Sequence, residues 1–352
     1  MKPEAKVVVS QAMNHLAKAL FICGCITWSS SVVFGQNEIA SKKFLQHERV
    51  VGAGKCIECH ESEVSAWRAT PHYENKDLHT KDKAREIARK MGIASAARIR
   101  SSQLCVQCHF TAQKLGNAPS RVIDGVSCES CHGGAKHWLD IHNTGDRRDG
   151  NDTTAARTKA VEAGMLPPDD YCSIAQNCFS CHIVTDEKLV NVGGHPAGSA
   201  DFELVAWLEG MVRHNFFASN GKTNDATPIE RRRMLYIAGV ALDLEYSLRG
   251  LARAKKKADY GKFMGRSTQT ARTALNSIVK TLAENAPEQL EQMITAVNKP
   301  GLLKFFNVGP LTAAADSVSA SLKDFCRQHN GHSFGAIDGM LPTEGRGPVF
   351  QP

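Results

Sequence analysis

Hydrophobic and polar positions follow two different patterns along this chain of 352 residues. From Thr223 onward, apolar residues recur every three or four positions, as in Met234, Ile237, Ala241, Leu244, Leu248 and Leu251. This spacing is typical of the buried face of a helix that packs against a partner helix. Between Lys55 and about residue 220 the apolar periodicity is poor, and polar loops and glycines alternate with short cysteine motifs. The pattern therefore predicts a helical domain over residues 223–352 and a loop-rich region before it.

Local start and stop signals place the C-terminal helices. The segment TPIE at 227–230 predicts a helix start, with Thr227 as N-cap, Pro228 at the first helical position and Glu230 completing a capping box. Further helices are expected over 268–284, 287–298 and 311–329, and an extended tail is expected from Gly331 onward. Packing or dimerisation explains these helices, so we expect no chemistry in this domain.

Four pentapeptides of the form Cys-x-x-Cys-His supply the candidate chemistry: CIECH at 56–60, CVQCH at 105–109, CESCH at 128–132 and CFSCH at 178–182. If 128–132 is helical, offsets of three and four place Cys128, Cys131 and His132 on one face. The two thiols of such a motif can add to the vinyl groups of a haem while the imidazole binds its iron. The sequence therefore predicts four covalently bound haem c groups. The attaching residues are Cys56, Cys59, Cys105, Cys108, Cys128, Cys131, Cys178 and Cys181, with His60, His109, His132 and His182 as proximal ligands.

Two other uses of paired cysteines fit less well. Tetrahedral zinc sites would combine the Cys-x-x-Cys units, but they give no reason for a histidine after every second cysteine. A thioredoxin-like dithiol needs one motif in a βαβ setting, which this chain does not show. Haem attachment explains both cysteines and the histidine of each motif.

The amino terminus predicts export. Lysines precede the short apolar run ALFICGCITWSSSVVFG, which is interrupted by serines, so we interpret residues 1–35 as a signal peptide cleaved after Gly35. A retained anchor or lipidation at Cys25 are the alternatives. The expected organisation is signal peptide 1–35, tetrahaem domain 36–222 and helical domain 223–352, in a periplasmic or equivalent compartment. In an oxidising compartment Cys172 and Cys326 could form a disulfide, which the sequence does not decide.

The charge does not favour nucleic acid as a partner. Residues 1–35 hold three lysines and one glutamate, which account for +2 of the formal net charge of +7 and leave +5 for the mature chain. Haem propionates would offset most of this, so basic-patch arguments for nucleic acid are weak.

Several stretches of the chain resemble the cytochrome c-554 family. They are KCIECHESEVSAWRATPH, GVSCESCHGG with DIH after it, NCFSCH, and FELVAWLEGMVRHNF, and together they cover roughly residues 52–217. This family comprises tetrahaem electron carriers that accept electrons from hydroxylamine oxidoreductase. The resemblance does not extend to the C-terminal domain, whose role stays open.

The resemblance implies that His72, His142 and His214 are distal haem ligands, with His214 expected on a helix. The family leaves the iron of its second motif without a distal ligand, which implies an open iron at His109. Phe110 and Leu115 suggest an apolar wall beside that iron. His195 and His137 depart from the family pattern, and either could close the site.

A histidine following a motif by only about ten residues would have to pass around a wide haem to reach the iron of that same motif. Ligation of a neighbouring haem is therefore expected for His72.

These observations predict a mainly α fold, with short helices and loops around four haems and a C-terminal helical bundle. The leading hypothesis is a carrier that transfers electrons between redox partners in hydroxylamine or nitric oxide metabolism, with a hydroxylamine oxidoreductase-like multihaem enzyme as partner. The alternative is an enzyme that acts on a small nitrogen oxide at an open iron of His109. A third hypothesis is a subunit that assembles, or forms homo-oligomers, through the C-terminal helices.

Overall fold

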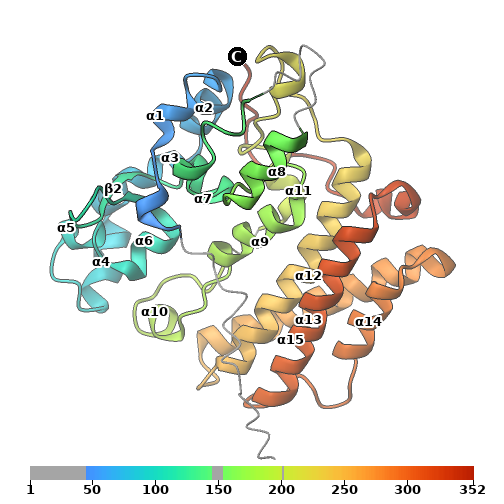
Figure 1. The fold of residues 1–352 in the computed structure, drawn as a ribbon. Coiled ribbons are helices and arrows are strands. Elements are labelled where there is room, and N and C mark those ends of the chain that lie inside the picture. Colours follow the sequence, from blue (N-terminus) through green and yellow to red (C-terminus); the bar gives the residue numbers. More distant parts are fainter. Residues whose placement is uncertain (1–44, 145–153, 200–201) are drawn as a thin grey trace, which may run out of the picture. The chain divides into compact units, whose positions relative to one another are not determined.

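The computed structural model describes residues 45–144, 154–199 and 202–352. The predicted signal peptide and Cys25 lie outside these residues. Helix accounts for 60% of the structure and strand for 3%, which confirms the mainly α class (Figure 1). In the part of the chain that is described, no helix combines the length and the apolar character needed to cross a bilayer.

Short helices and loops make up the region before residue 223. Its α-helices are α1 (Ala53–Cys56), α2 (Glu61–Arg68), α3 (Pro71–Glu74), α4 (Asp82–Lys90), α5 (Ala96–Ile99), α6 (Gln103–His109), α7 (Cys128–His132), α8 (Thr154–Glu162), α9 (Tyr171–His182), α10 (Glu187–Asn191) and α11 (Leu204–Leu208). Short 3-10 turns are η1 (His47–Arg49), η2 (Asn75–Thr80), η3 (Ala135–His137) and η5 (Phe217–Ser219). Strands β1 (Thr111–Gln113) and β2 (Arg121–Asp124) form an antiparallel hairpin in which Ala112 pairs with Val122.

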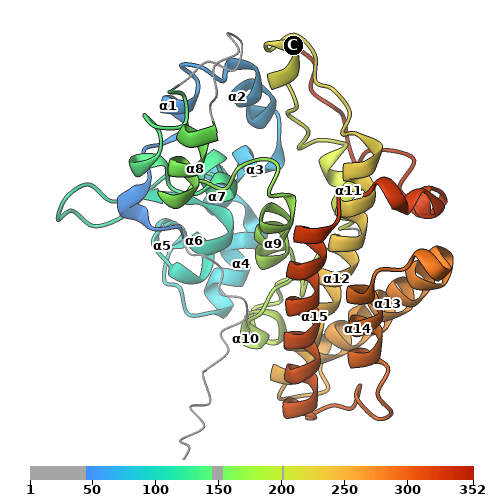
Figure 2. The same ribbon diagram turned by 45° about the vertical axis from the view of Figure 1, so that its right-hand side comes forward.

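Four longer helices form the C-terminal bundle: α12 (Ile229–Arg253), α13 (Asp259–Leu282), α14 (Glu288–Val297) and α15 (Val308–Gln328). Helices α13 and α15 both pack along α12, and α14 packs on α15 (Figures 1 and 2). The six residues of the predicted apolar stripe, from Met234 to Leu251, are at most 1% exposed. The predicted packing face is therefore confirmed. Helices α14 and α15 lie close to the ranges expected for them, whereas α13 begins at Asp259, well before the expected residue 268.

Two local predictions in this region are wrong. Helix α12 begins at Ile229 with Pro228 as its N-cap, because Thr227 is used elsewhere: its amide donates to Glu209 and its hydroxyl accepts from Asn215. The stretch after Gly331 is not an extended tail throughout, since a 3-10 segment, η7 (His332–Met340), packs on α12 and α13.

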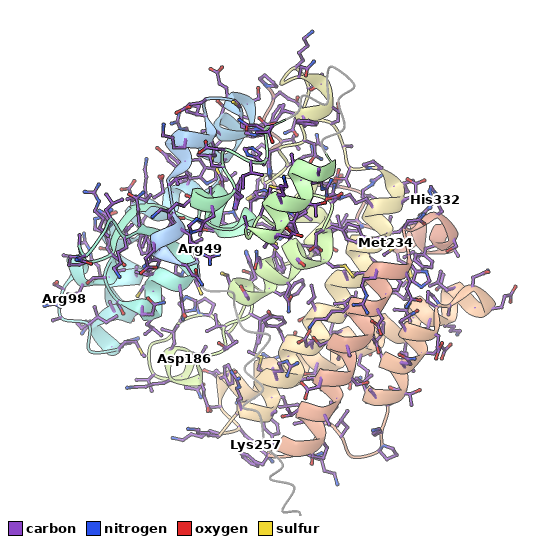
Figure 3. The ribbon with its side chains drawn as sticks, in the orientation of Figure 1. Arg49, Arg98, Asp186, Met234, Lys257 and His332 are labelled. Atoms are coloured by element: carbon purple, nitrogen blue, oxygen red, sulfur yellow. A yellow bond between two sulfur atoms is a disulfide. The ribbon has the colours of Figure 1, made fainter. Side chains whose placement is uncertain are left out.

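Apolar residues of η7 explain why it folds back. The side chains of Phe334 and Ile337 are at most 1% exposed, and the Phe334 ring stacks on Phe325 of α15 at a centroid distance of 5.6 Å. Burying such side chains stabilises a segment by about 1.5–3 kcal/mol each. Figure 3 labels Met234 at the start of the buried stripe and His332 at the start of η7.

A single hydrophobic core continues across residue 223. Ala175 and Phe179 of α9 and Leu204 of α11 belong to the same buried cluster as the α12 stripe. A disulfide joins Cys172 of α9 to Cys326 of α15. The division at residue 223 stays a prediction, and the packing shows that the bundle supports the helix that carries the fourth motif.

The interface between α12 and α13 contains the carboxyl group of Asp243, which is largely shielded from water. The Ser267 hydroxyl donates to Asp243 across 2.7 Å, and burial raises the pKa of Asp243 to about 6. Elsewhere in the bundle, Arg249 pairs with both Glu245 and Asp316. Asp243 is therefore a partly buried acid that accepts a hydrogen bond from Ser267, and it is costly to ionise.

Candidate functional site

Each Cys-x-x-Cys-His motif lies at the end of a helix. The second, third and fourth motifs are the last residues of α6, α7 and α9, and all three helices end at the motif histidine. The first begins at Cys56, the last residue of α1, and its histidine, His60, is the N-cap of α2. Residues 128–132 form α7, so the condition for Cys128, Cys131 and His132 to share one helix face is met.

Every motif histidine faces a second histidine from another part of the chain. The ring centroids are 6.3 Å apart for His60 and His142, 6.2 Å for His182 and His72, 6.1 Å for His109 and His195, and 6.3 Å for His132 and His214. The structure therefore brings together the predicted proximal ligands, the three distal histidines implied by the family resemblance, and His195. His72 faces His182 of the fourth motif, not His60 of its own, as cross-ligation requires.

This spacing fits an iron atom between the two rings. A metal–imidazole nitrogen distance of about 2.0 Å on each side, plus about 1.1 Å from nitrogen to ring centre, separates the centroids by about 6.2 Å. Aromatic pairs in direct contact span a similar range, but they favour particular ring orientations. Here the interplanar angle varies from 23° to 81° while the distance varies by only 0.2 Å. A constant distance with a free angle is the geometry of two ligands on one metal.

Hydrogen bonds at the other ring nitrogen orient these histidines. Nδ1 lies 3.0 Å from the Leu166 carbonyl in His132, 2.6 Å from that of Leu139 in His142, 2.7 Å from that of Pro196 in His195 and 2.7 Å from that of Val212 in His214. A carbonyl oxygen only accepts, so Nδ1 must carry the proton and Nε2 keeps its lone pair. Ligating histidines are fixed in this way by their outer partners.

Burial favours the neutral imidazole that a metal requires. Desolvation lowers the pKa of His132 and of His182 to about 4 each, and it also lowers the pKa of His72.

In the first motif the Glu63 carboxylate, 3.8 Å from Nδ1 of His60, raises the pKa of that ring. A carboxylate at this position increases the basicity of a ligand.

The motif cysteines do not form the two alternative sites. Among the described residues, no three or more histidine, cysteine, aspartate or glutamate side chains gather where they could hold one metal ion, as a zinc site requires. Reactive dithiols need a lowered thiol pKa. Burial raises the pKa of the Cys131 thiol to about 11 and raises those of Cys105 and Cys178, so the second, third and fourth motifs do not meet this requirement, whereas neighbouring Cys128 lowers the pKa of Cys56 in the first motif. Cysteine pairs beside paired histidines therefore fit covalently attached haem.

A buried carboxylate that our sequence interpretation missed fixes the third motif. Glu129, at the first variable position of CESCH, is 1% exposed and accepts hydrogen bonds from the amides of Val51 (2.9 Å), Gly52 (2.8 Å) and Ala135 (2.8 Å). These bonds tie the segment before the first motif to the third motif. A charged residue inside a motif looks solvent-exposed in sequence, so no signal marked it.

Close backbone packing positions His72. The amide of Val126 donates to the His72 carbonyl at 2.9 Å, and the indole of Trp67 donates to the Val126 carbonyl at 2.7 Å. A Cβ at Gly125 would lie 2.2 Å from the His72 carbonyl oxygen, so only glycine allows this approach. The GVS residues before the third motif therefore hold the histidine that faces the fourth.

Aromatic side chains hold the histidine of the fourth motif. The Phe202 ring stacks on His182 with centroids 4.2 Å apart and an interplanar angle of 13°. Trp207 of α11 lies 5.8 Å from the same imidazole. Phe202 also packs against Phe179 of α9. The sequence between the fourth motif and α12 therefore positions this imidazole.

Two expectations about the environment of the histidines are wrong. His214 does not lie on a helix, because α11 ends at Leu208 and the chain reaches His214 through a turn. Leu115 is 61% exposed, and Phe110 is buried instead in the small core of α4, α5 and α6, so these two residues do not form a common wall. His137 is exposed at the end of η3.

Comparison with known proteins supports the site. A family model described as cytochrome c554 and c-prime matches residues 55–133, which contain the first three motifs and His72. The predicted family resemblance is confirmed. Cytochrome c-554 of Nitrosomonas europaea is 24% identical over 172 residues, which are 47% of this chain and 69% of that protein. No solved structure matches this chain.

The match has a direct consequence for the cofactor. Similarity to a c-type cytochrome implies covalently bound haem c and a role in electron transfer. The histidine pairs and the motif cysteines described above are residues that fit this group.

Proposed function

We propose that this chain is an exported tetrahaem c-type cytochrome that transfers electrons between redox partners in hydroxylamine or nitric oxide metabolism. The observation that supports it most directly is the repeated histidine pairing, in which His142, His72 and His214 face the histidines of the first, fourth and third motifs. Bound haem c supplies one-electron oxidation and reduction at each site.

The chain places the four motifs in a continuous spatial order. Helix α1, which ends at Cys56 of the first motif, packs against α7, which carries the third. The side chain of Asn177, on α9, donates at 3.1 Å to the carbonyl of Cys131, which joins the third motif to the fourth. The loop of His195 joins the fourth motif to the second: its Ser199 hydroxyl lies 3.2 Å from Nδ1 of His182, and the His195 ring faces His109 at 6.1 Å.

The resulting order is first, third, fourth, second, so each motif adjoins at least one other. Close neighbours are what electron hopping requires. Hydrogen bonds hold that spacing: the Val51 and Gly52 amides, just before the first motif, donate to Glu129 of the third, and α9 is joined to the C-terminal bundle by its disulfide. The chain itself therefore acts as a rigid frame for the redox groups.

The family resemblance supports a partner enzyme, and the motifs and the disulfide support a compartment. The cytochrome c-554 resemblance supports a hydroxylamine oxidoreductase-like multihaem enzyme as electron donor. The motifs support the periplasm or an equivalent compartment, because we expect haem c to be attached outside the cytoplasm, and the Cys172–Cys326 disulfide suits an oxidising compartment.

Intact mass of the full chain, exported together with a haem c maturation system, tests the haem count. We expect the mass of the chain without residues 1–35 plus four haems. A variant with Cys128→Ala and Cys131→Ala should lose one haem. The matched control, Cys172→Ala with Cys326→Ala, should keep four because those cysteines lie outside the motifs. A mature wild-type chain without four haem additions would contradict the proposal.

Rapid mixing tests the transfer itself. Oxidised cytochrome mixed with a multihaem hydroxylamine oxidoreductase and hydroxylamine should become reduced, and a second oxidised cytochrome should then reoxidise it. Hydroxylamine without the enzyme is the control. Reduction that is no faster with the enzyme than without it would exclude this partner while leaving the haem count untouched.

A further inference from the structure

The second motif is the one whose distal face the family resemblance leaves open, and here a histidine lies opposite it. His109 ends α6, and the His195 ring is at a centroid distance of 6.1 Å from it. The other three pairs lie at 6.2–6.3 Å. The fourth pair therefore has the same room for one iron atom as the three that match expected ligands.

The loop that carries His195 is built for this position. Helix α10 begins after Asp186, whose side chain accepts from the amide of Leu189 at 2.7 Å (Figure 3). The chain then turns back, so that the His195 amide donates to the Leu189 carbonyl at 3.2 Å. The turn passes through Gly194 at φ +74°, a conformation that glycine adopts without strain. The bond to the Leu189 carbonyl and the turn at Gly194 therefore fix the position of His195.

A hydrogen bond determines which ring nitrogen of His195 is available as a ligand. Nδ1 of His195 lies 2.7 Å from the Pro196 carbonyl, so Nδ1 carries the proton and Nε2 keeps its lone pair. The same device orients His132, His142 and His214. His195 therefore has the same tautomer as His132, His142 and His214, and its ring lies at the same spacing from a motif histidine.

The chain after His195 is fastened to the fourth motif. The Val184 amide donates to the Ala197 carbonyl at 2.9 Å, and Ser199 contacts His182 through both its amide (3.3 Å, to the carbonyl) and its hydroxyl (3.2 Å, to Nδ1). Both sides of the loop are therefore held by hydrogen bonds. An imidazole carried on such a loop stays in place and does not act as a mobile cover.

We propose that His195 is the second axial ligand of the iron bound at His109, so that all four irons carry two histidines. The inference rests on the proposed function, since it requires haem at the second motif. It replaces the open iron implied by the family resemblance, and it separates this chain from an enzyme: a small nitrogen oxide could reach an iron only by displacing a histidine. The chain is then an electron carrier at every site.

Spin state and ligand binding of the intact holoprotein test this directly. Low-temperature electron paramagnetic resonance of the oxidised wild-type protein should show four low-spin ferric haems. Carbon monoxide added to the reduced protein should leave its absorption spectrum unchanged, because a vacant ferrous position is needed to bind it. One high-spin haem, together with one carbon monoxide bound per chain, would overturn the assignment. Four covalent haems in the same sample would show that the proposed function survives, and their absence would show that the proposed function itself fails.

Three substitutions assign the ligand to His195. His195→Ala should convert one haem of four to high spin without loss of covalent haem, and added imidazole should restore low spin. His195→Met should stay low-spin with a more positive potential at one haem, since methionine is an axial ligand that raises it. His137→Ala, which removes an exposed histidine, is the control and should behave as wild type. Four low-spin haems in both His195 variants, with an unchanged potential, would refute ligation even if the wild type is fully low-spin.

Discussion

Removing the Glu129 carboxylate should destabilise the protein by about 3–4 kcal/mol, because three amides depend on it. The amides of Gly52 and Ala135 donate to it in fully buried surroundings, and that of Val51 is partly buried. A buried amide left without an acceptor costs about 1–3 kcal/mol, whereas a partly buried one recovers water. The two buried amides dominate the expected effect of Glu129→Ala.

Guanidinium unfolding of the oxidised holoprotein, followed by far-ultraviolet circular dichroism, measures this change. At an unchanged slope, the shift in midpoint gives the difference in unfolding free energy. Glu129→Gln keeps the shape and one acceptor oxygen and should lose less than the alanine variant. Glu58→Ala is the matched control, because Glu58 also occupies a variable position of a motif but has a 61% exposed side chain paired only with Lys55 at the surface. Its effect should stay within about 0.5 kcal/mol.

The reasoning would be refuted if Glu129→Ala unfolded within about 1 kcal/mol of wild type while keeping all its haem. Such a result would mean that water replaces the carboxylate at these amides, and that the first and third motifs do not depend on Glu129 for their spacing.

Three further results are expected. Asp243→Asn should raise the free energy of unfolding by about 3 kcal/mol near pH 7 and change it little below about pH 4. Burial raises the pKa of this carboxyl from 3.8 to about 6 in the folded protein, so above pH 3.8 the unfolded chain ionises more readily and ionisation favours unfolding. Thermal unfolding at both pH values checks this. Replacing Cys172 and Cys326 by alanine should cost about 2–5 kcal/mol, since the bridge closes a loop with a sequence separation of 154, and an unchanged denaturation midpoint would contradict it. His214→Ala should convert one low-spin haem to high spin while intact mass shows all haems retained, and an unchanged low-spin count would instead make His214 a structural residue.

Much of the chemistry follows from local sequence. A Cys-x-x-Cys-His motif needs only one helical turn to place two thiols and an imidazole together, so the cofactor and the proximal ligands can be predicted without a fold. The α12 stripe is equally local, because apolar residues at a spacing of three and four mark a packing face wherever the helix lies. The family resemblance supplied His72, His142 and His214, and the structure places each of them opposite a motif histidine.

Which histidine faces which motif is decided by tertiary structure. His72 follows the first motif but lies against His182 of the fourth, and His195 follows the fourth but lies against His109 of the second. Residue spacing predicted that His72 would not serve its own motif, but which motif each histidine faces depends on how separate loops pack. The same holds for Glu129, because two of its three donors, the amides of Val51 and Gly52, are distant in sequence and only that of Ala135 is near. Sequence determined what each motif can bind. Long-range packing determined which second histidine faces each motif histidine, because the two members of every pair are far apart in sequence and meet only when separate loops pack together.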